Sequence, residues 1–375
     1  MIRDADYAAD LRRIGERAGV HELRLGPLRL AIVPEWQLRV ATGAFAPDGS
    51  SLGWLNRPKL RSGENDPRAN LWGGLERLWL GPEGGPGTVY FKPGEDYDLE
   101  HWTVPELVDR VPFEVRARAD DWIEACARGA VLSRAGERFD VGLQRRVELL
   151  SPKQALGAEP PSAVQGLSFA SDNVLTNVGA EPWSSSNGGL CLWLAGMFPH
   201  AERGVAYAAA PSAVTPGAVT DYFFAVNSDR LRALGSGLAF RIDGQHRSKI
   251  GIPAAKATGW MGAWDPQRER LTLVRAEVDA GAEYLEARWS ADRGPFGGEA
   301  LHLYNDGPPA PGTAPFGPFF ELESSSPAAV LGPGERRAHR SVTTLLTGPR
   351  AALDAIAQSH LGVSLHELEA VFQGR

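Results

Sequence analysis

Two glutamates in the last fifth of the chain have the type and spacing that acid–base chemistry requires. The run Phe319 to Glu323 is typical of a short β-strand, in which Glu321 and Glu323 share one face and the apolar Phe320 and Leu322 share the other. At the rise of an extended strand, the two carboxylates lie roughly 7 Å apart. If this face is shielded from water, at least one carboxylate is hard to ionise, which prepares it to act as a general base or acid near neutral pH. A solvated strand face is the alternative interpretation.

Polar and aromatic residues gather in further clusters along the chain. The glycine-rich stretch from Trp72 to Gly85 contains Arg77 and Glu83, and its glycines allow the backbone to approach a ligand closely. The other clusters contribute these candidates: Asn177, Asp243, His246, Lys249, Asn305 and Asp306. Taken singly, each cluster is also explained by a turn or a helix cap. Together they supply the hydrogen-bonding groups and aromatic surfaces that bind a sugar.

A large sandwich usually presents one principal cleft. We therefore predict that the densest clusters meet the glutamate pair on one concave surface. The residues expected there, besides the pair itself, are Arg77, Glu83, His246, Lys249, Asn305 and Asp306.

Other kinds of chemistry lack their motifs. The sequence contains no Gly-x-Ser-x-Gly nucleophile elbow and no glycine-rich phosphate loop ending in Lys-Ser/Thr. His366 and Glu367 begin a zinc-protease motif, but Ala370 stands where the second histidine belongs. Cys126 and Cys191 are far apart in apolar surroundings, as expected of buried thiols. We expect neither a metal site nor a cofactor.

The overall charge and hydropathy pattern narrow the choice of partners. A formal net charge of −7 argues against binding to nucleic acid or to an anionic membrane surface. The N-terminal residues lack the apolar core of a signal peptide, and no apolar run approaches the ~20 residues of a membrane helix. We expect a cytoplasmic protein whose partner is a small-molecule carbohydrate. A monomer and a homodimer both remain open.

Period-two alternation of apolar residues predicts strands through most of the chain. The alternation is clearest in the runs 36–40, 139–149, 238–242 and 271–273. The 43 glycines and 28 prolines are spread along the chain as turn markers, so no segment is indicated as a domain linker. The proline-rich segment 307–318 is predicted to be a surface loop. This pattern indicates a mostly β protein built as a large antiparallel sandwich.

Helical patterns are confined to the two ends of the chain. Apolar residues at helical spacing predict an N-terminal helix within residues 1–19, and residues 346–375 are predicted to hold C-terminal helices. Ser364 and Glu367 form a capping box at the start of the last helix. We predict a single domain, 1–375, whose β-sandwich occupies residues 20–345.

The order of three motifs resembles the galactose mutarotase-like superfamily, which includes aldose 1-epimerases, hexose-phosphate epimerases and uncharacterised branches. The motifs are Gly73-Gly74 followed by Trp79-Leu-Gly-Pro-Glu83, then Leu175-Thr-Asn-Val-Gly179, then Phe320-Glu-Leu-Glu323 followed by Leu331-Gly-Pro-Gly-Glu335. The resemblance covers about residues 22 to 345 and is closest to an uncharacterised branch. It implies the supersandwich fold of that superfamily.

The resemblance also implies roles for individual residues. Glu321 takes the place of the base that acts on the anomeric hydroxyl, with Glu323 as the competing assignment, and Arg77 takes the place of a substrate-binding arginine. The chain departs from the family because it has no histidine between His101 and His200, where the general acid is expected. His246 is the nearest candidate for that role.

Three functions remain compatible with these residues. The first is a sugar epimerase or mutarotase that uses only acid–base groups. The second is a carbohydrate-binding protein that keeps the cleft without catalysis. The third is a lyase or hydrolase on the same sandwich, which needs a tyrosine or a second carboxylate across the cleft.

Overall fold

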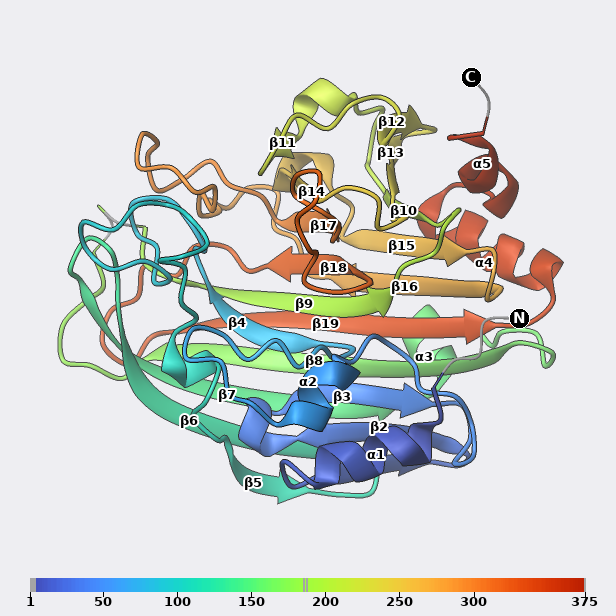
Figure 1. Ribbon diagram of the computed structural model, residues 1–375, viewed down its shortest axis with the longest axis horizontal. Coiled ribbons are helices and arrows are strands. Elements are labelled where there is room, and N and C mark those ends of the chain that lie inside the picture. Colours follow the sequence, from blue (N-terminus) through green and yellow to red (C-terminus); the bar gives the residue numbers. More distant parts are fainter. Residues whose placement is uncertain (1–4, 185, 187, 374–375) are drawn as a thin grey trace.

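The computed structural model describes residues 5–184, 186 and 188–373 of the chain. Antiparallel strands form three sheets, and short helices occupy the ends and a few connections (Figure 1). The predicted antiparallel β-sandwich is thereby confirmed.

The largest sheet has ten strands. In spatial order they are β12 (Leu231–Leu234), β13 (Gly237–Arg241), β10 (Val205–Ala208), β15 (Trp260–Asp265), β16 (Arg270–Ala276), β19 (Arg336–Thr347), β8 (Gln165–Asn177), β7 (Arg138–Leu150), β6 (Trp122–Leu132) and β5 (Glu114–Arg118). The six-stranded sheet has the order β11 (Thr220–Asp221), β14 (Ser248–Ile252), β17 (Leu301–Asn305), β18 (Phe319–Ser325), β9 (Cys191–Pro199) and β4 (Arg77–Gly81). The three-stranded sheet consists of β1 (His21–Leu25), β2 (Leu28–Val33) and β3 (Arg39–Ala44).

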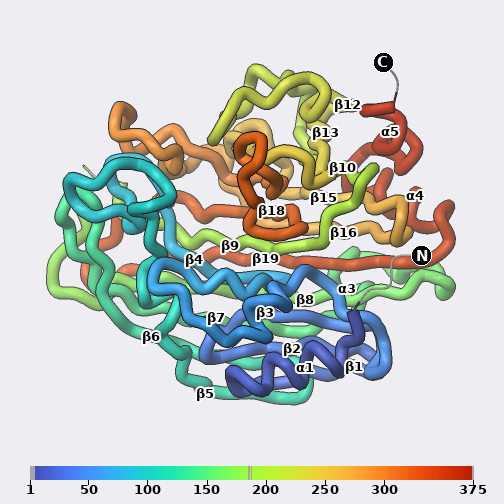
Figure 2. The backbone as a smooth tube through the Cα atoms, in the orientation of Figure 1, coloured from blue at the N-terminus to red at the C-terminus, as the bar shows by residue number. Residues whose placement is uncertain are grey.

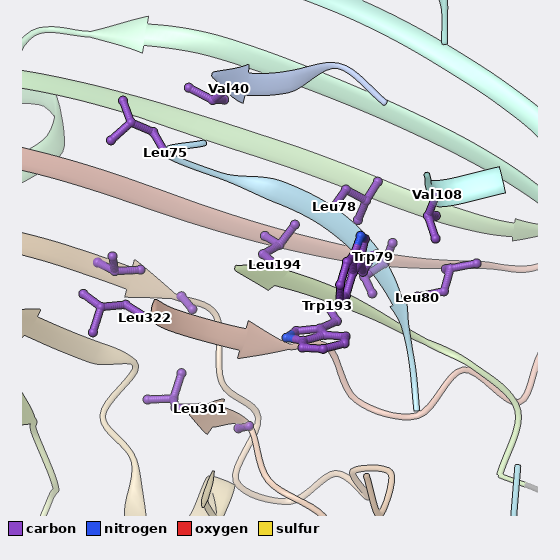
Figure 3. Packing of buried hydrophobic residues seen from close by; sticks show 14 of the residues in the cluster. Val40, Leu75, Leu78, Trp79, Leu80, Val108, Trp193, Leu194, Leu301 and Leu322 are labelled. Carbon is purple, nitrogen blue, oxygen red and sulfur yellow. The ribbon is translucent and has the colours of Figure 1, made fainter. Parts of the chain in front are cut away.

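The two smaller sheets pack against the ten-stranded sheet through one continuous core. Leu194 of β9 and Leu322 of β18 share a buried cluster with Leu143 of β7 and Leu175 of β8. Val40 of β3 belongs to the same cluster, and Figure 3 shows it with Leu194 and Leu322. The six-stranded sheet therefore buries one face in the core and leaves its other face for a site.

Strand β18 divides its residues between these two faces as the alternation predicts. Phe320 and Leu322 lie in the core cluster, so Glu321 and Glu323 lie on the opposite face. Both glutamates are nevertheless buried, at 5% and 0% exposure. The alternative interpretation of this pair, a solvated strand face, is therefore wrong.

The other predicted strands are confirmed except for the run 36–40. The runs 139–149 and 271–273 fall within β7 and β16, and the run 238–242 coincides with β13 except for Ile242, which lies one residue beyond its end. The run 36–40 was predicted wrongly, because a 3-10 helix, η1 (Pro34–Trp36), precedes β3. Gln37 and Leu38 then adopt left-handed backbone conformations, with φ of 61° and 53°. Pro34 suits the first position of such a turn, and this local geometry outweighs the alternation.

Helices lie at both ends of the described chain, as predicted. The N-terminal helix α1 (Tyr7–Gly15) is followed near the C-terminus by α4 (Arg350–Leu361) and α5 (Leu365–Ala370). The capping box of Ser364 and Glu367 is present at the start of α5. Two short helices, α2 (Arg57–Ser62) and α3 (Pro152–Leu156), and three further 3-10 turns, η2 (Glu106–Val108), η4 (Pro216–Ala218) and η5 (Ala254–Lys256), occupy connections.

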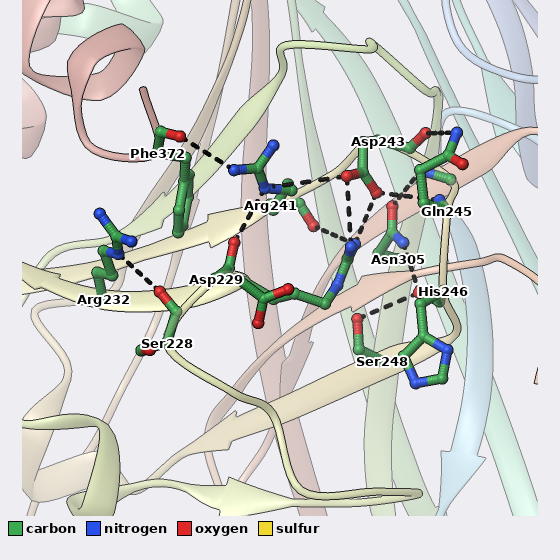
Figure 4. Close-up of polar contacts among 12 residues, drawn as sticks. Ser228, Asp229, Arg232, Arg241, Asp243, Gln245, His246, Ser248, Asn305 and Phe372 are labelled. Carbon is green, nitrogen blue, oxygen red and sulfur yellow. Dashed lines mark hydrogen bonds and ion pairs between the residues drawn. The ribbon is translucent and has the colours of Figure 1, made fainter. Parts of the chain in front are cut away.

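The C-terminal helices cover one end of the ten-stranded sheet (Figure 1). Leu353 of α4 and Leu365 of α5 share a buried cluster with Tyr207 of β10 and Trp264 of β15. Beyond α5, the carbonyl of Phe372 accepts a hydrogen bond from Arg241 of β13 at 3.3 Å (Figure 4). These helices are thus part of the packed fold.

Candidate active site

The free face of the six-stranded sheet carries two adjoining rows of polar side chains. In the first row, Glu321 of β18 pairs with Tyr304 of β17, which pairs in turn with Lys249 of β14. In the second row, Glu323 pairs with His302. Residues directly opposite each other on antiparallel strands project to the same side of a sheet. The strand register alone therefore assembles these five side chains.

Glu321 lies beside a guanidinium group from the edge strand β4. Arg77 Nη2 donates a hydrogen bond to Oε1 of Glu321 at 3.0 Å, and the same guanidinium lies 3.5 Å from the centre of the Trp79 ring. Burial raises the pKa of Glu321 to about 8, with the charge of Arg77 lowering it and the charge of Glu323 raising it. Glu321 thus titrates close to neutral pH.

Glu323 lies deeper and keeps its negative charge. Its Oε2 accepts hydrogen bonds from Lys249 Nζ at 2.9 Å and from Trp193 Nε1 at 2.8 Å. Burial would raise the pKa of Glu323, but the positive charge of Lys249 beside it gives a net lowering. The environments of the two glutamates push their pKa values apart, which is the arrangement that separates an acid from a base.

A third carboxyl group, Glu83, faces the same pocket from the segment after β4. Its Oε2 lies 4.0 Å from Lys249 Nζ. Burial raises the pKa of Glu83, although Lys249 opposes the effect. Lys249 therefore stands between two carboxyl groups, and burial lowers its pKa less than Glu323 and Glu83 together raise it. The ammonium stays charged.

Tyr222 and His302 form a neutral extension of this network. The Tyr222 hydroxyl donates to Glu299 at 2.6 Å and lies 2.9 Å from His302 Nε2. Burial and the nearby Lys249 lower the pKa of His302 to about 3, so its ring is neutral at physiological pH. Gly251 makes the contact possible, since a Cβ at that position would meet the Tyr222 ring at 2.9 Å.

These groups line a pocket of about 360 Å³, within the usual range for small-molecule sites. Most of its wall is aromatic. The lining side chains are Leu71, Arg77, Trp79, Glu83, Leu99, Trp102, Trp193, Met197, Tyr222, Phe223, Phe224, Arg247, Lys249, Trp289, Tyr304, Pro309, Phe316, Phe319 and Glu321. Trp79 and Trp193 meet edge to face, with ring centres 5.0 Å apart, and Figure 3 shows them side by side. The lining residues that lie in loops come from parts of the chain that are distant in the sequence and therefore differ in colour in Figure 2.

The predicted site residues fall into three groups. Arg77, Glu83, Lys249 and Glu321 line the pocket, and Glu323 lies directly behind them, bonded to Lys249. This group joins segments more than 200 residues apart in the chain.

Asn305 and Asp306 support the pocket from behind. Asn305 is fully buried. Its side-chain amide donates a hydrogen bond to the carbonyl of His246 at 2.8 Å and so holds the turn before β14. Asp306 accepts hydrogen bonds from Tyr304 at 2.6 Å and from Arg247 at 3.3 Å. Both of those donors line the pocket, so Asp306 acts on it by positioning them.

His246, Asp243 and Asn177 lie outside the pocket lining. Figure 4 shows the His246 ring directed away from Asp243, and its contact is with the Phe224 ring, 5.6 Å between centres. Asp243 pairs with Arg230 at 2.7 Å. Asn177 bonds the carbonyl of Leu331 at 2.9 Å and so fixes the turn before β19. All three have structural partners that explain them.

Sequence reasoning missed Trp193, Tyr222, His302 and Tyr304 as members of the site. His302 and Tyr304 could have been found from the alternation of β17, because both share a face that the core residues Leu301 and Leu303 leave free. Tyr222 follows the two-residue strand β11 and carries no comparable signal.

No group of three or more histidine, cysteine, aspartate or glutamate side chains suited to a metal ion occurs among residues 5–184, 186 and 188–373. Cys126 and Cys191 are free thiols in the structure. Within the same described part of the chain, no helix is long and apolar enough to cross a membrane.

The architecture is that of the galactose mutarotase-like sandwich proteins. A galactose mutarotase-like protein from Lactobacillus casei superposes with a TM-score of 0.52 and 10% identity, covering 87% of this chain and 100% of the other. A galactose mutarotase related enzyme from Lactobacillus acidophilus gives a TM-score of 0.50 and 11% identity, covering 87% and 97%. A protein of Synechocystis, Slr1438, gives 0.52 and 14%, covering 89% and 97%. At these identities the likeness establishes the fold.

The sequence itself assigns the chain to a family. Residues 5–372 match the family of unknown function DUF6786, and the protein belongs to that family. Comparison with curated proteins gave no match.

Proposed function

We propose that the protein is a carbohydrate-active enzyme that transfers protons on a sugar or sugar derivative bound in this pocket, in the manner of an aldose epimerase. The observation that carries the proposal is Glu321, a buried carboxyl group that titrates near neutral pH on the wall of an aromatic pocket. Aromatic faces suit the apolar side of a sugar ring, and charged groups suit its hydroxyls. The fold of proteins named after galactose mutarotase supports this reading.

In the proposed reaction, Glu321 is the base and Glu83 the acid. Ionised Glu321 takes the proton of the anomeric hydroxyl, the bond between the anomeric carbon and the ring oxygen breaks, and its electron pair goes to the ring oxygen. Protonated Glu83 supplies the proton that the ring oxygen needs, which is favoured by the burial that raises its pKa. Ring closure on the other face of the carbonyl reverses these transfers. Glu83 thereby replaces the histidine that the chain lacks.

Arg77 and Glu323 set the charge state of the base. The hydrogen bond from Arg77 stabilises ionised Glu321, so the base is available despite its burial. Glu323, held by Lys249 and Trp193, repels that charge and keeps the pKa of Glu321 close to neutrality. Proton transfer by placed groups of this kind typically accelerates a reaction by about 10² to 10⁴.

The test is anomer exchange measured by NMR saturation transfer over a panel of aldoses and their 6-phosphates. We expect exchange with at least one sugar, and its loss in Glu321→Gln and in Glu83→Gln. Glu16→Gln, at an exposed position after α1, is the matched control and should exchange normally. Exchange that persists in Glu321→Gln would contradict the assignment. Thermal stabilisation by a sugar without any exchange would favour a non-catalytic binding protein.

One observation favours a second candidate function. The pocket holds, besides Glu321, a second carboxyl group, Glu83, and two tyrosines, Tyr222 and Tyr304. A carboxylate pair or a tyrosine facing a carboxylate is what a hydrolase or lyase needs. Release of nitrophenol from nitrophenyl glycosides, or a new ultraviolet absorbance from an unsaturated product, would support that alternative over epimerisation.

A further inference from the structure

The side chains at the mouth of the pocket are apolar, whereas those at its floor, on the free face of the six-stranded sheet, include charged groups. Among the described residues, six large hydrophobic side chains are markedly exposed, and three of them line this one pocket: Leu99, Phe224 and Phe316 at 42%, 48% and 41%. Exposed hydrophobic side chains scattered singly need no explanation, but their collection at the rim of a site indicates a binding surface.

Each of the three side chains comes from a different loop. Leu99 lies between β4 and η2, Phe224 between β11 and β12, and Phe316 between β17 and β18. Three segments that are distant in the chain thus each place a hydrophobic side chain at the same opening. The predicted surface loop 307–318 is one of them, and it also contributes Pro309 to the pocket lining.

The two aromatic rings, Phe224 and Phe316, are both held by neighbours. The Arg247 guanidinium lies 4.2 Å from the centre of the Phe316 ring, and Arg247 is itself paired with the buried Asp306 at 3.3 Å. The Phe224 ring packs against the His246 ring. His246 thus acquires a role at the rim, behind the lining. Rings that are ordered before a ligand arrives lose less conformational freedom on binding.

We propose that the ligand is a sugar carrying an apolar substituent, aryl or acyl, whose ring lies against the charged floor and whose substituent covers Leu99, Phe224 and Phe316. The inference rests on the proposed function and adds the substrate class. A sugar without an apolar substituent would leave the hydrophobic side chains of the rim exposed to water. A second sugar unit would also need hydrogen-bonding partners there, and the five rim side chains Leu99, Phe223, Phe224, Pro309 and Phe316 offer none. Arg247, the charged group against Phe316, is already paired with Asp306.

Calorimetric titration with matched probes tests the inference. For glucose, galactose and mannose, the probes are the free sugar, the methyl glycoside, the phenyl glycoside, the 6-O-benzoyl sugar and a disaccharide. We expect the phenyl or benzoyl member of at least one set to bind about tenfold or more tightly than its unsubstituted or methyl counterpart. In Phe224→Ala and Phe316→Ala the gain should fall to about threefold or less. Leu132→Ala, at an exposed apolar position outside the pocket, should keep the full gain.

The position of the substituent separates this inference from the proposed reaction. A gain with the 6-O-benzoyl sugar supports both, because the anomeric hydroxyl stays free for exchange. A gain confined to phenyl glycosides supports the inference and favours bond cleavage over epimerisation.

Other results would overturn the inference. Sugars that bind equally well with and without the apolar group would reject it and leave the proposed function standing. The same gain from a disaccharide would replace the apolar group by a second sugar. Phenol or benzoate binding as tightly as the substituted sugars, or no binding by any probe, would contradict the inference and the proposed function together.

Discussion

At the scale of single residues, the site depends on how burial and charge divide protons between two neighbouring glutamates. Glu323 is tied to Lys249 and stays ionised, whereas Glu321 is protonated over most of the range below pH 8. The pair titrates as a unit, so changing either member affects the other.

Glu321→Gln keeps the shape of the side chain and cannot accept a proton. We expect turnover to fall by about 10² to 10⁴, the usual contribution of a general base, with sugar affinity nearly unchanged. In the wild type, kcat/KM should rise as pH increases towards about 8, because only ionised Glu321 is a base, and should fall again where Glu83 loses its proton. Rate profiles from pH 5 to 10 check this. A falling limb that disappears in Glu321→Gln and persists in Glu83→Gln would identify Glu321 as the acid.

The same pKa shift makes stability depend on pH. The pKa of Glu321 is raised from 4.5 to about 8 in the folded protein, so between these values the folded state binds more protons than the unfolded state. The contribution of Glu321 to the free energy of unfolding therefore decreases as pH rises through this window, whereas buried histidines with a lowered pKa, such as His302, contribute the opposite slope. Urea denaturation of the wild type and of Glu321→Gln at pH 5, 6.5 and 8 isolates this contribution, because the histidines are the same in both proteins. The free energy of unfolding of the wild type minus that of the variant should become smaller as pH rises. A difference that does not change with pH would contradict the raised pKa of Glu321.

Lys249→Met leaves the buried carboxylate of Glu323 without its positive partner. We expect a loss of about 3–5 kcal/mol in the free energy of unfolding, as for other broken buried pairs. Adding Glu323→Gln should restore much of it, since the amide carries no charge and its oxygen can still accept from Trp193. Lys153→Met, at an exposed position in α3, is the control for the substitution itself. If the double variant is no more stable than the single one, the pair does not carry the energy assigned to it.

At the scale of elements, the register of the six-stranded sheet positions the chemistry. β14, β17, β18, β9 and β4 each contribute side chains to the free face, and glycine at 251 leaves the space into which Tyr222 leans. A rigid sheet holds such groups more reproducibly than loops do.

Gly251→Ala tests whether that space matters. The added Cβ would meet Glu299 and the Tyr222 ring at 2.7 and 2.9 Å, so Tyr222 must move off His302. We expect a destabilisation of about 1–3 kcal/mol, the usual cost of overpacking, together with weaker ligand binding. Gly217→Ala, where a Cβ meets nothing within 4 Å, should be nearly neutral. Thermal melts with and without ligand measure both effects. A variant that melts and binds like the wild type would show that Tyr222 is not held by this contact.

At the scale of the whole molecule, the ten-stranded sheet joins the two halves of the chain. β19 near the C-terminus pairs along its whole length with β8, which pairs in turn with β7. Neither half therefore contains all of the ten-stranded or of the six-stranded sheet, and the chain should unfold as one cooperative unit.

A protease site inserted between Glu159 and Pro160, in an exposed connection, tests this continuity. After cleavage we expect the two pieces to remain together on size-exclusion chromatography and to melt in a single transition, because the β7–β8 and β4–β9 pairings join one piece to the other. Pieces that separate and melt independently would indicate two domains.

The sequence by itself determined the class of fold and part of the composition of the site. Alternation of apolar residues located β7, β13 and β16 and assigned the opposite faces of β18, because side chains on a strand alternate whatever the strand pairs with. The spacing of Glu321 and Glu323, and the clusters holding Arg77, Glu83 and Lys249, identified groups that line or adjoin the pocket. Local signals of this kind are carried by neighbours in the chain and can be read without the fold.

Only the tertiary structure decided which of those groups meet and what charge they bear. Sequence proximity placed His246 beside Lys249, yet the turn directs the two side chains to different surroundings. Strand register brought in His302 and Tyr304, and pairing among six strands far apart in the chain created the pocket. The pKa of Glu321 likewise depends on burial and on Arg77, 244 residues away. Long-range pairing and desolvation are properties of the packed molecule, so no local pattern in the sequence records them.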